Sequence, residues 1–275
     1  MLPAVGRLRA ASLLEESGPN RVRLPGPART YAERYLPAGA WDQYGPTGVV
    51  YYLAVTEAAD GLLGGAGYGV GLDILLTELP NLHAFADWGL AQAGEGAAQA
   101  ARLVGALRNL YMLLSWPGEG VARLQRATEA AHRAGDAQAE ANTLQAIGDV
   151  QQFRDEREAA LESYGQALGL FRAVGARLGE ANTLQGIGRA RLAQGDEKDG
   201  LANLEQAAAL YETVGDRAGA SNVHITLARL AAAKGDLQTA IAHLQPAADF
   251  GKAIGHPLGD QLQAQIDAWR EQLKN

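Results

Sequence analysis

Amide and carboxylate side chains recur between residues 142 and 152 at helical intervals. The four residues are Asn142, Gln145, Asp149 and Gln152. An α-helix turns 100° per residue, so this spacing places all four on one stripe. A side-chain amide both donates and accepts hydrogen bonds, which suits a polypeptide backbone as ligand. Later copies of this stripe are Asn182, Gln185 and Arg189, then Asn222, Ile225 and Arg229. The arginines beside Asp149 suit a ligand with an acidic end.

Residues for catalysis do not occur in a recognisable pattern. The only Gly-Lys pair, Gly251-Lys252, lacks the upstream glycine of a phosphate-binding loop. The glycines from Gly64 to Gly71 do not follow G-x-G-x-x-G and are interpreted as a flexible loop. The five histidines, none paired at i,i+3 or i,i+4, are His83, His132, His224, His243 and His256. We therefore predict no catalytic residue, cofactor or metal; a hydrolase with unfamiliar residues is the alternative.

Composition and charge narrow the class of protein further. Hydrophobic residues make up 47% of the 275 residues, only 6% are aromatic, and the abundance of Ala and Leu favours helix. Residues 1–34 hold six arginines and three glutamates, so the net charge of −7 leaves −10 on the remainder. Such an acidic body argues against nucleic acid as the partner. The absence of cysteine and of long apolar runs predicts a cytoplasmic protein with no membrane partner.

The stripe belongs to a repeated segment. ANTLQAIG at 141–148 returns as ANTLQGIG at 181–188, and a weaker copy occupies 221–228. A fixed period of about 40 residues indicates one supersecondary unit that is copied and stacked. The helix pairs that we expect are 96–114 with 119–134, 136–153 with 156–174, 176–193 with 196–214, and 216–233 with 236–254. A last helix, 257–273, should cap the array.

The front of the chain is less regular. We expect a helix over 2–14, a short strand over 21–24 and a helix over 28–36, followed by a connector over 37–48. Two leading helices follow, over 49–63 and 72–93, and Pro80 should kink the second or start a new helix at Asn81. The predicted domains are 1–36, 37–93, the array 94–254 and the cap 255–275. The array divides near 94–134, 135–174, 175–214 and 215–254.

Each expected pair has a packing stripe and a cap. Leu144, Ile147 and Gly148 share one face of the first helix in the second pair. On the second helix, Ala160, Tyr164, Ala167 and Phe171 share another face. The small residues should let the two helices approach closely. The aspartates expected to cap helix N-termini are Asp136, Asp196, Asp216 and Asp236.

This arrangement resembles the tetratricopeptide repeat (TPR), in the longer variety of kinesin light chain and bacterial signalling proteins. The resemblance covers about residues 95–254. It rests on a large residue, Leu144, a large–small pair, Ile147-Gly148, and the spaced residues Ala160, Tyr164 and Ala167. His224 departs from it, as do Leu204 and Leu244 at the tyrosine position. The resemblance to the TPR implies an all-α fold: a right-handed superhelix of about four hairpins with a C-terminal capping helix.

A second resemblance covers the front. ELPNLHAFADW, residues 78–88, is similar to the helix that leads into the repeats of bacterial signal-transduction ATPases (the NB-ARC/AP-ATPase type, also called STAND). ASLLEE, RVRL and RTYAERYL at 11–16, 21–24 and 29–36 look like part of their winged-helix domain, although Pro25-Gly26-Pro27 replaces the usual His-Leu. The winged helix could contact DNA, but in that family it usually acts as an internal lever. The ATPase itself is missing.

These resemblances imply a protein or peptide ligand in a concave groove lined by the polar stripe. Stacked helices lie about 8–10 Å apart, so Asn142, Asn182 and Asn222 would meet about every third residue of an extended peptide. Alternatively, these asparagines hydrogen-bond locally at their helix starts. The chain is then either the sensor half of such an ATPase or a free-standing adaptor. Oligomerisation is expected only through the ATPase, so the chain alone should be a monomer.

Overall fold

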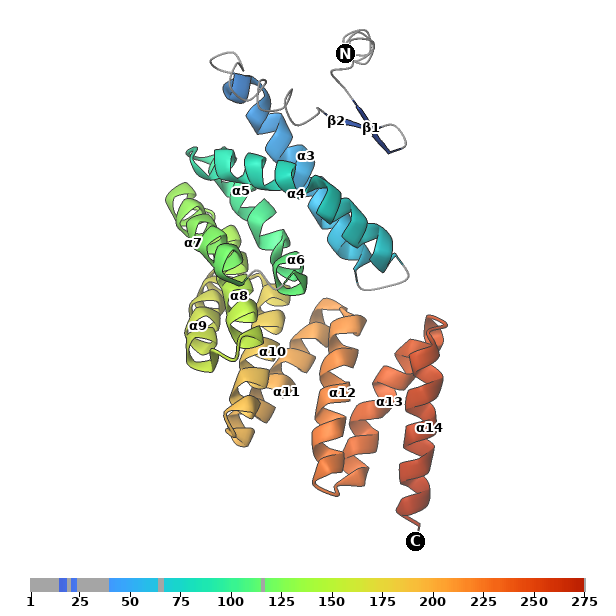
Figure 1. Ribbon diagram of the computed structural model, residues 1–275. Coiled ribbons are helices and arrows are strands. Elements are labelled where there is room, and N and C mark those ends of the chain that lie inside the picture. Colours follow the sequence, from blue (N-terminus) through green and yellow to red (C-terminus); the bar gives the residue numbers. More distant parts are fainter. Residues whose placement is uncertain (1–14, 19–20, 24–39, 64–66, 115–116, 275) are drawn as a thin grey trace. The chain divides into compact units, whose positions relative to one another are not determined.

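The computed structural model in Figure 1 describes residues 15–18, 21–23, 40–63, 67–114 and 117–274. The chain divides into two compact units, 1–46 and 47–275, which are described separately. Within the described residues there are two short strands, β1 and β2, and twelve helices, α3 to α14.

The first unit contains a small antiparallel hairpin. Strand β1 (Glu15–Gly18) pairs with β2 (Arg21–Arg23), with Glu15 opposite Arg23 and Glu16 opposite Val22. The predicted strand over 21–24 is therefore present over Arg21–Arg23. Its partner strand, between the helix expected over 2–14 and the strand expected over 21–24, was not predicted. The helices predicted over 2–14 and 28–36 lie outside the described residues.

The leading helices are longer than predicted. Helix α3 (Ala40–Leu62) begins inside the expected connector and contains Pro46, and α4 (Tyr68–Leu90) begins inside the expected glycine loop. Both expectations are wrong because the glycines permit close helix contact. A β-carbon on Gly48 would overlap the Phe85 ring, and one on Gly71 would lie 2.5 Å from the Ala59 carbonyl oxygen.

Helix α4 runs through Pro80 without interruption, so no new helix starts at Asn81. Proline removes one N–H and therefore frees the carbonyl group four residues earlier, which belongs to Leu76. Both residues are exposed, so water can bind this carbonyl. The solvent-facing side of the helix thus tolerates a residue that its buried side would not.

One expected helix is broken. The segment 96–114 forms α5 (Glu95–Ala106) and α6 (Arg108–Leu113), and α7 (Pro117–Ala134) follows. At the break, the Leu107 N–H bonds the Val104 carbonyl in a tighter turn, and its side chain is fully buried. The turn redirects the chain so that Leu110 and Tyr111 are buried as well.

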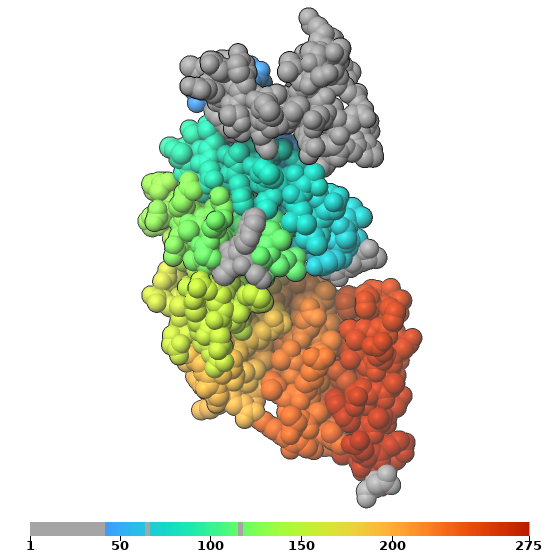
Figure 2. Space-filling model, viewed as in Figure 1, coloured from blue at the N-terminus to red at the C-terminus, as the bar shows by residue number. Residues whose placement is uncertain are grey.

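The remaining helices follow the expected pattern to within one residue at each end. They are α8 (Ala137–Phe153), α9 (Arg157–Val174), α10 (Arg177–Ala193), α11 (Glu197–Val214), α12 (Arg217–Ala233), α13 (Leu237–Ala253) and α14 (Pro257–Gln272). Figure 1 shows them as successive antiparallel hairpins, and in the space-filling view their colours follow one another in chain order (Figure 2). The predicted all-α stack of hairpins with a C-terminal capping helix is confirmed. No helix in the described ranges is long and apolar enough to cross a membrane.

The four predicted aspartate caps are confirmed. A carboxylate oxygen of each accepts a hydrogen bond from the backbone three residues on, where the first amides of a helix lack partners. The pairs are Asp136 with Ala139 at 3.0 Å, Asp196 with Asp199 at 3.4 Å, Asp216 with Gly219 at 2.9 Å, and Asp236 with Thr239 at 3.0 Å.

A left-handed residue follows each helix from α7 to α13. Its φ is positive at the regularly spaced glycines Gly135, Gly175, Gly195, Gly215, Gly235 and Gly255. The position midway between the first two is Asp155, whose φ of 63° lies in the same region. A β-carbon makes this conformation unfavourable, so Asp155 stores strain that the glycines avoid.

Asp155→Gly is therefore expected to stabilise the protein by about 1 kcal/mol. The ion pair that Asp155 forms with Arg157 at 2.7 Å is exposed and contributes little. Urea denaturation checks the change. Asp155→Ala is the control, since it keeps the β-carbon and should gain nothing, and a less stable glycine variant would contradict the argument.

Candidate functional site

Tyr164 of α9 connects two neighbouring first helices. Its buried ring lies between two glycines: a β-carbon on Gly148 of α8 or on Gly186 of α10 would come within 2.6 or 2.7 Å of it. The ring thus fills the space that the glycines leave and fixes the position of its hydroxyl group. That hydroxyl lies 2.8 Å from Asp149 Oδ1 and 2.9 Å from Gln152 Oε1.

Tyr211 of α11, at a different repeat position, also directs its hydroxyl to the polar side chains of the first helix in its hairpin. Its hydroxyl lies 2.8 Å from Gln185 Oε1 and also donates to Asn182 Oδ1. Burial raises the pKa of Tyr211 to about 12, so the phenol stays protonated and acts as a donor. The tyrosine hydroxyls therefore hold the polar side chains of α8 and α10 in place from behind.

Asp149 is the charged centre of this region. Its Oδ2 lies 3.5 Å from Arg108 Nη1 of α6, and its Oδ1 accepts a hydrogen bond from the Tyr164 hydroxyl. Burial raises the pKa of the Asp149 carboxyl above its ordinary value, although Arg108, the Tyr164 hydroxyl and Arg189 act in the opposite direction. One half-buried carboxylate thus lies within electrostatic range of two guanidinium groups.

The predicted stripe is partly covered, so the expectation that all of it faces outward is wrong. Gln145 is only 5% exposed and accepts a hydrogen bond from Thr183 of α10 at 3.4 Å. Gln152, Asn182 and Gln185 are half-buried. The reason is that α10 packs over one edge of the α8 stripe, which the pattern of a single helix does not show.

The exposed members are Asn142, Asn222, Arg189 and Arg229. Among the described residues, the side chains of both asparagines form no hydrogen bond. The third asparagine, Asn182, accepts a hydrogen bond from Tyr211 of the next helix. The expected alternative, in which each asparagine side chain bonds locally at its own helix start, is therefore not seen within the described residues. Ile225, at the third glutamine position, packs against the last hydrophobic cluster. We call the surface of Arg108, Asn142, Asp149, Arg189 and Arg229 the groove face.

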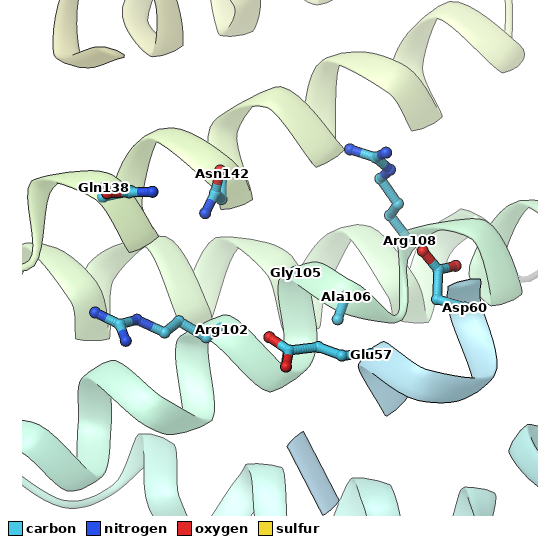
Figure 3. A pocket seen from close by; sticks show the side chains of 8 residues that line it. All are labelled: Glu57, Asp60, Arg102, Gly105, Ala106, Arg108, Gln138 and Asn142. Carbon is cyan, nitrogen blue, oxygen red and sulfur yellow. The ribbon is translucent and has the colours of Figure 1, made fainter. Parts of the chain in front are cut away.

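A pocket of about 410 Å³ adjoins the groove face at α8. Its lining comes from α3, α5, α6 and α8: Glu57, Asp60, Arg102, Gly105, Ala106, Arg108, Gln138 and Asn142. Figure 3 shows Gln138 and Asn142 on one side of α8, above the helix that carries Arg102. Arg102 binds Asp136 at 2.6 Å and Asp60 accepts a bond from Asn109 at 2.8 Å, so these walls are held in place.

Two histidines that the sequence keeps apart lie together. His224 of α12 and His243 of α13 have Nδ1 atoms 3.2 Å apart, and His224 Nε2 lies 3.2 Å from Glu212. Burial lowers the pKa of His243, and His224 lowers it further, so His243 favours its neutral form. Across the described ranges, no cluster of three or more metal-ligating side chains occurs. His224 is half-buried.

Two groups were missed by the sequence analysis. Arg108 was hidden inside a helix that is actually broken at Leu107, and Tyr211 stands at the position of Phe171, one repeat later. Tyr211 could have been found, because a hydroxyl added to a packing position needs a hydrogen-bond partner. Arg108 could not have been found, since its position depends on the direction that the chain takes at the break between α5 and α6.

Comparisons with known proteins agree with this fold. Residues 119–252 match the family model described as soluble NSF attachment protein, SNAP. No curated protein matches the sequence. BtubC (BKLC) from P. vanneervenii superimposes with a TM-score of 0.57 at 16% identity, over 76% of this chain and 92% of that one. A putative kinesin light chain of Podosopora anserina with nearly identical TPR-like repeats superimposes with a TM-score of 0.50 at 16% identity. The match covers 66% of this chain and 94% of that one.

A third structure is a STAND protein with a tetratricopeptide repeat sensor from Pyrococcus horikoshii. Its TM-score is 0.50 at 14% identity; the match covers 96% of this chain and 47% of that one, so this chain spans about half of that protein. At such identities the likeness concerns the fold alone. The array is a TPR-like helical solenoid.

Proposed function

We propose that this protein is a non-catalytic module that binds a segment of another protein along the groove face. The observation that carries the proposal is that exposed amides, which form no side-chain hydrogen bond with any described residue, adjoin a rigid support. Asn142 and Gln138 project beside the pocket, whereas Tyr164 and Tyr211 hold the neighbouring polar side chains from behind. Such a preorganised surface loses little side-chain entropy when it binds.

The finer proposal is that the module senses a ligand for a signal-transduction ATPase in the cytoplasm. It is supported by the STAND protein with a TPR sensor, whose match covers almost all of this chain. It is also supported by residues 78–88, which lie in α4 and lead into the array as the resemblance implies. The winged-helix segment at the front belongs to the same proposal, and so does the expectation that the chain alone is monomeric.

A free-standing adaptor is the second candidate. It is favoured by BtubC, because 92% of that chain is matched by the present one, without a large additional part. The coding sequence upstream distinguishes the two candidates: an in-frame P-loop ATPase supports the sensor, and a separate upstream gene supports the adaptor.

Asn142→Ala combined with Asn222→Ala tests the binding surface. Both side chains are exposed and form no hydrogen bond within the described part of the chain, so the fold should not change. We expect capture of the partner from the native cytoplasm to fall about tenfold or more, measured by pull-down and quantitative mass spectrometry. The matched control is Glu162→Ala with Gln166→Ala, on the exposed face of α9, which should capture normally.

Circular dichroism and melting should be the same for both double variants. If the groove-face variant captures the partner as well as the control does, the groove face is not the binding surface and the proposal is wrong.

A further inference from the structure

The charge of the groove face is opposite to that of the whole protein. The chain carries −7, yet three of the helices that contribute to the groove face carry an arginine there: Arg108 on α6, Arg189 on α10 and Arg229 on α12. Neither Arg189 nor Arg229 forms an ion pair or hydrogen bond with another described residue. Two guanidinium groups are thus open to a ligand on an otherwise acidic molecule.

Arg108 and Arg189 act on the same small region. Both influence the ionisation of Asp149, Tyr164 and Tyr211, which come from α8, α9 and α11. Arg108 lies 3.5 Å from Asp149, and Arg189 occupies the register of Asp149 in the next first helix, so both arginines flank Asp149. Arg229 continues the line, because it occupies the register of Arg189 in the next repeat.

Asp149 is the carboxylate on this line. It lies 3.5 Å from Arg108, and only 25% of its side chain is exposed. It stands at the repeat position where the next two copies have arginine. In the free protein it neutralises part of the positive charge and thus occupies the place that a ligand carboxylate would take.

We propose that the groove face binds an acidic polypeptide segment, whose carboxylates pair with Arg189 and Arg229, and that Asp149 weakens this binding by neutralising Arg108. The inference rests on the proposed function and specifies its ligand. Guanidinium groups bind carboxylates through two parallel hydrogen bonds, and adjacent amides such as Asn142 can bind the peptide backbone between them.

A polypeptide fits this surface better than a nucleic acid does. Strong binding to nucleic acid depends on the neutralisation of many phosphates, about six to ten in well-studied cases. Here the described residues of the groove face offer only three arginines, Arg108, Arg189 and Arg229, and Asp149 already neutralises one of them. Sparse charges interleaved with amides match a chain whose acidic side chains alternate with peptide groups.

The test measures binding of a fluorescein-labelled oligo-glutamate peptide by fluorescence anisotropy, at about 50 mM salt to limit screening. We expect the wild-type protein to bind, and Arg189→Gln with Arg229→Gln to bind at least about tenfold more weakly. Asp149→Asn should bind several-fold more tightly, because it keeps the size of the side chain and the acceptor for Tyr164 but removes the charge.

Arg177→Gln with Lys198→Gln is the control of equal charge change. Both residues are exposed and outside the groove face, and this variant should bind nearly as well as wild type. The inference is overturned if this control weakens binding as much as the groove-face pair does, or if Asp149→Asn binds more weakly than wild type. It is also overturned if a single-stranded RNA oligonucleotide of equal length binds more tightly than the peptide.

Failure of this inference is distinguishable from failure of the proposed function. If the native partner is captured through Asn142 and Asn222 but oligo-glutamate does not bind, the proposed acidic ligand is wrong, whereas the proposal of a binding module is kept. If neither capture nor peptide binding depends on the groove face, both are wrong.

Discussion

Gly259→Ala is expected to loosen the capping helix and to cost about 3 kcal/mol of unfolding free energy. Gly259 is buried in the first turn of α14, where it crosses α13 at Gly251. An added β-carbon would lie 2.6 Å from the Gly251 carbonyl carbon and would also overlap the Lys252 nitrogen. Both are backbone atoms, which cannot rotate away, so the whole helix must shift.

The shift matters because α14 covers the last face of the array. Its Ile266 is fully buried against Leu244 and Ala248 of the last hairpin. In a solenoid each hairpin is stabilised mainly by its neighbours, so a displaced cap should let α12 and α13 open first. Urea denaturation gives the loss of stability, and hydrogen exchange should show lost protection over 257–272.

Gly165→Ala and Gly169→Ala are matched controls. Both glycines lie in the exposed part of α9, and no atom lies within 4 Å of an added β-carbon. Alanine favours helix over glycine, so each control should stabilise the protein by about 0.5–1 kcal/mol. A Gly259→Ala protein as stable as these controls would show that α14 does not need the close crossing.

Tyr164→Ala is expected to cost about 4 kcal/mol. The side chain is completely buried, and its ring is enclosed by Gly148 and Gly186, which cannot fill the cavity left behind. Asp149 and Gln152 also lose the hydroxyl donor. Chemical denaturation measures the loss.

Tyr164→Phe separates the hydroxyl from the ring and should cost about 1–2 kcal/mol at neutral pH. The hydroxyl stabilises the ionised Asp149, so its removal raises the pKa of that carboxyl further. The cost should therefore be fully present above the Asp149 pKa and decrease as the pH falls through it. Measurement of stability at several pH values checks this sign.

Leu204→Ala is the matched comparison, since Leu204 takes the place of Tyr164 one repeat later and is equally buried. It should cost about 3 kcal/mol, with no corresponding pH dependence of the difference from wild type. A Tyr164→Phe cost that does not change with pH would contradict the role assigned to the hydroxyl group.

The fold of the array was predictable because its signals are local. The repeat period, the aspartate caps and the small residues at 148, 160 and 167 each act within one hairpin. The same reasoning was less successful before residue 107. There, Gly48 and Gly71 were taken as signs of a connector and a loop, whereas in the structure they allow α3 and α4 to touch.

The candidate site was predictable only in part. Asn142, Asn222, Arg189 and Arg229 are exposed as the stripe implies, but α10 covers Gln145, and Tyr211 binds Asn182. A helical stripe shows which residues share a side of one helix. It does not show how far the next hairpin leans over that side.

By itself, the amino-acid sequence determined the kind of protein: repeated helical hairpins, their ends and the polar side of each first helix. It could do so because helix periodicity and capping depend on residues within a few positions of one another. The tertiary structure alone decided that Arg108 meets Asp149, that His224 meets His243 and that the Tyr164 hydroxyl supports Asp149 from behind. These contacts join residues of different helices that are far apart in the sequence, and only the packing angle between helices brings such residues together.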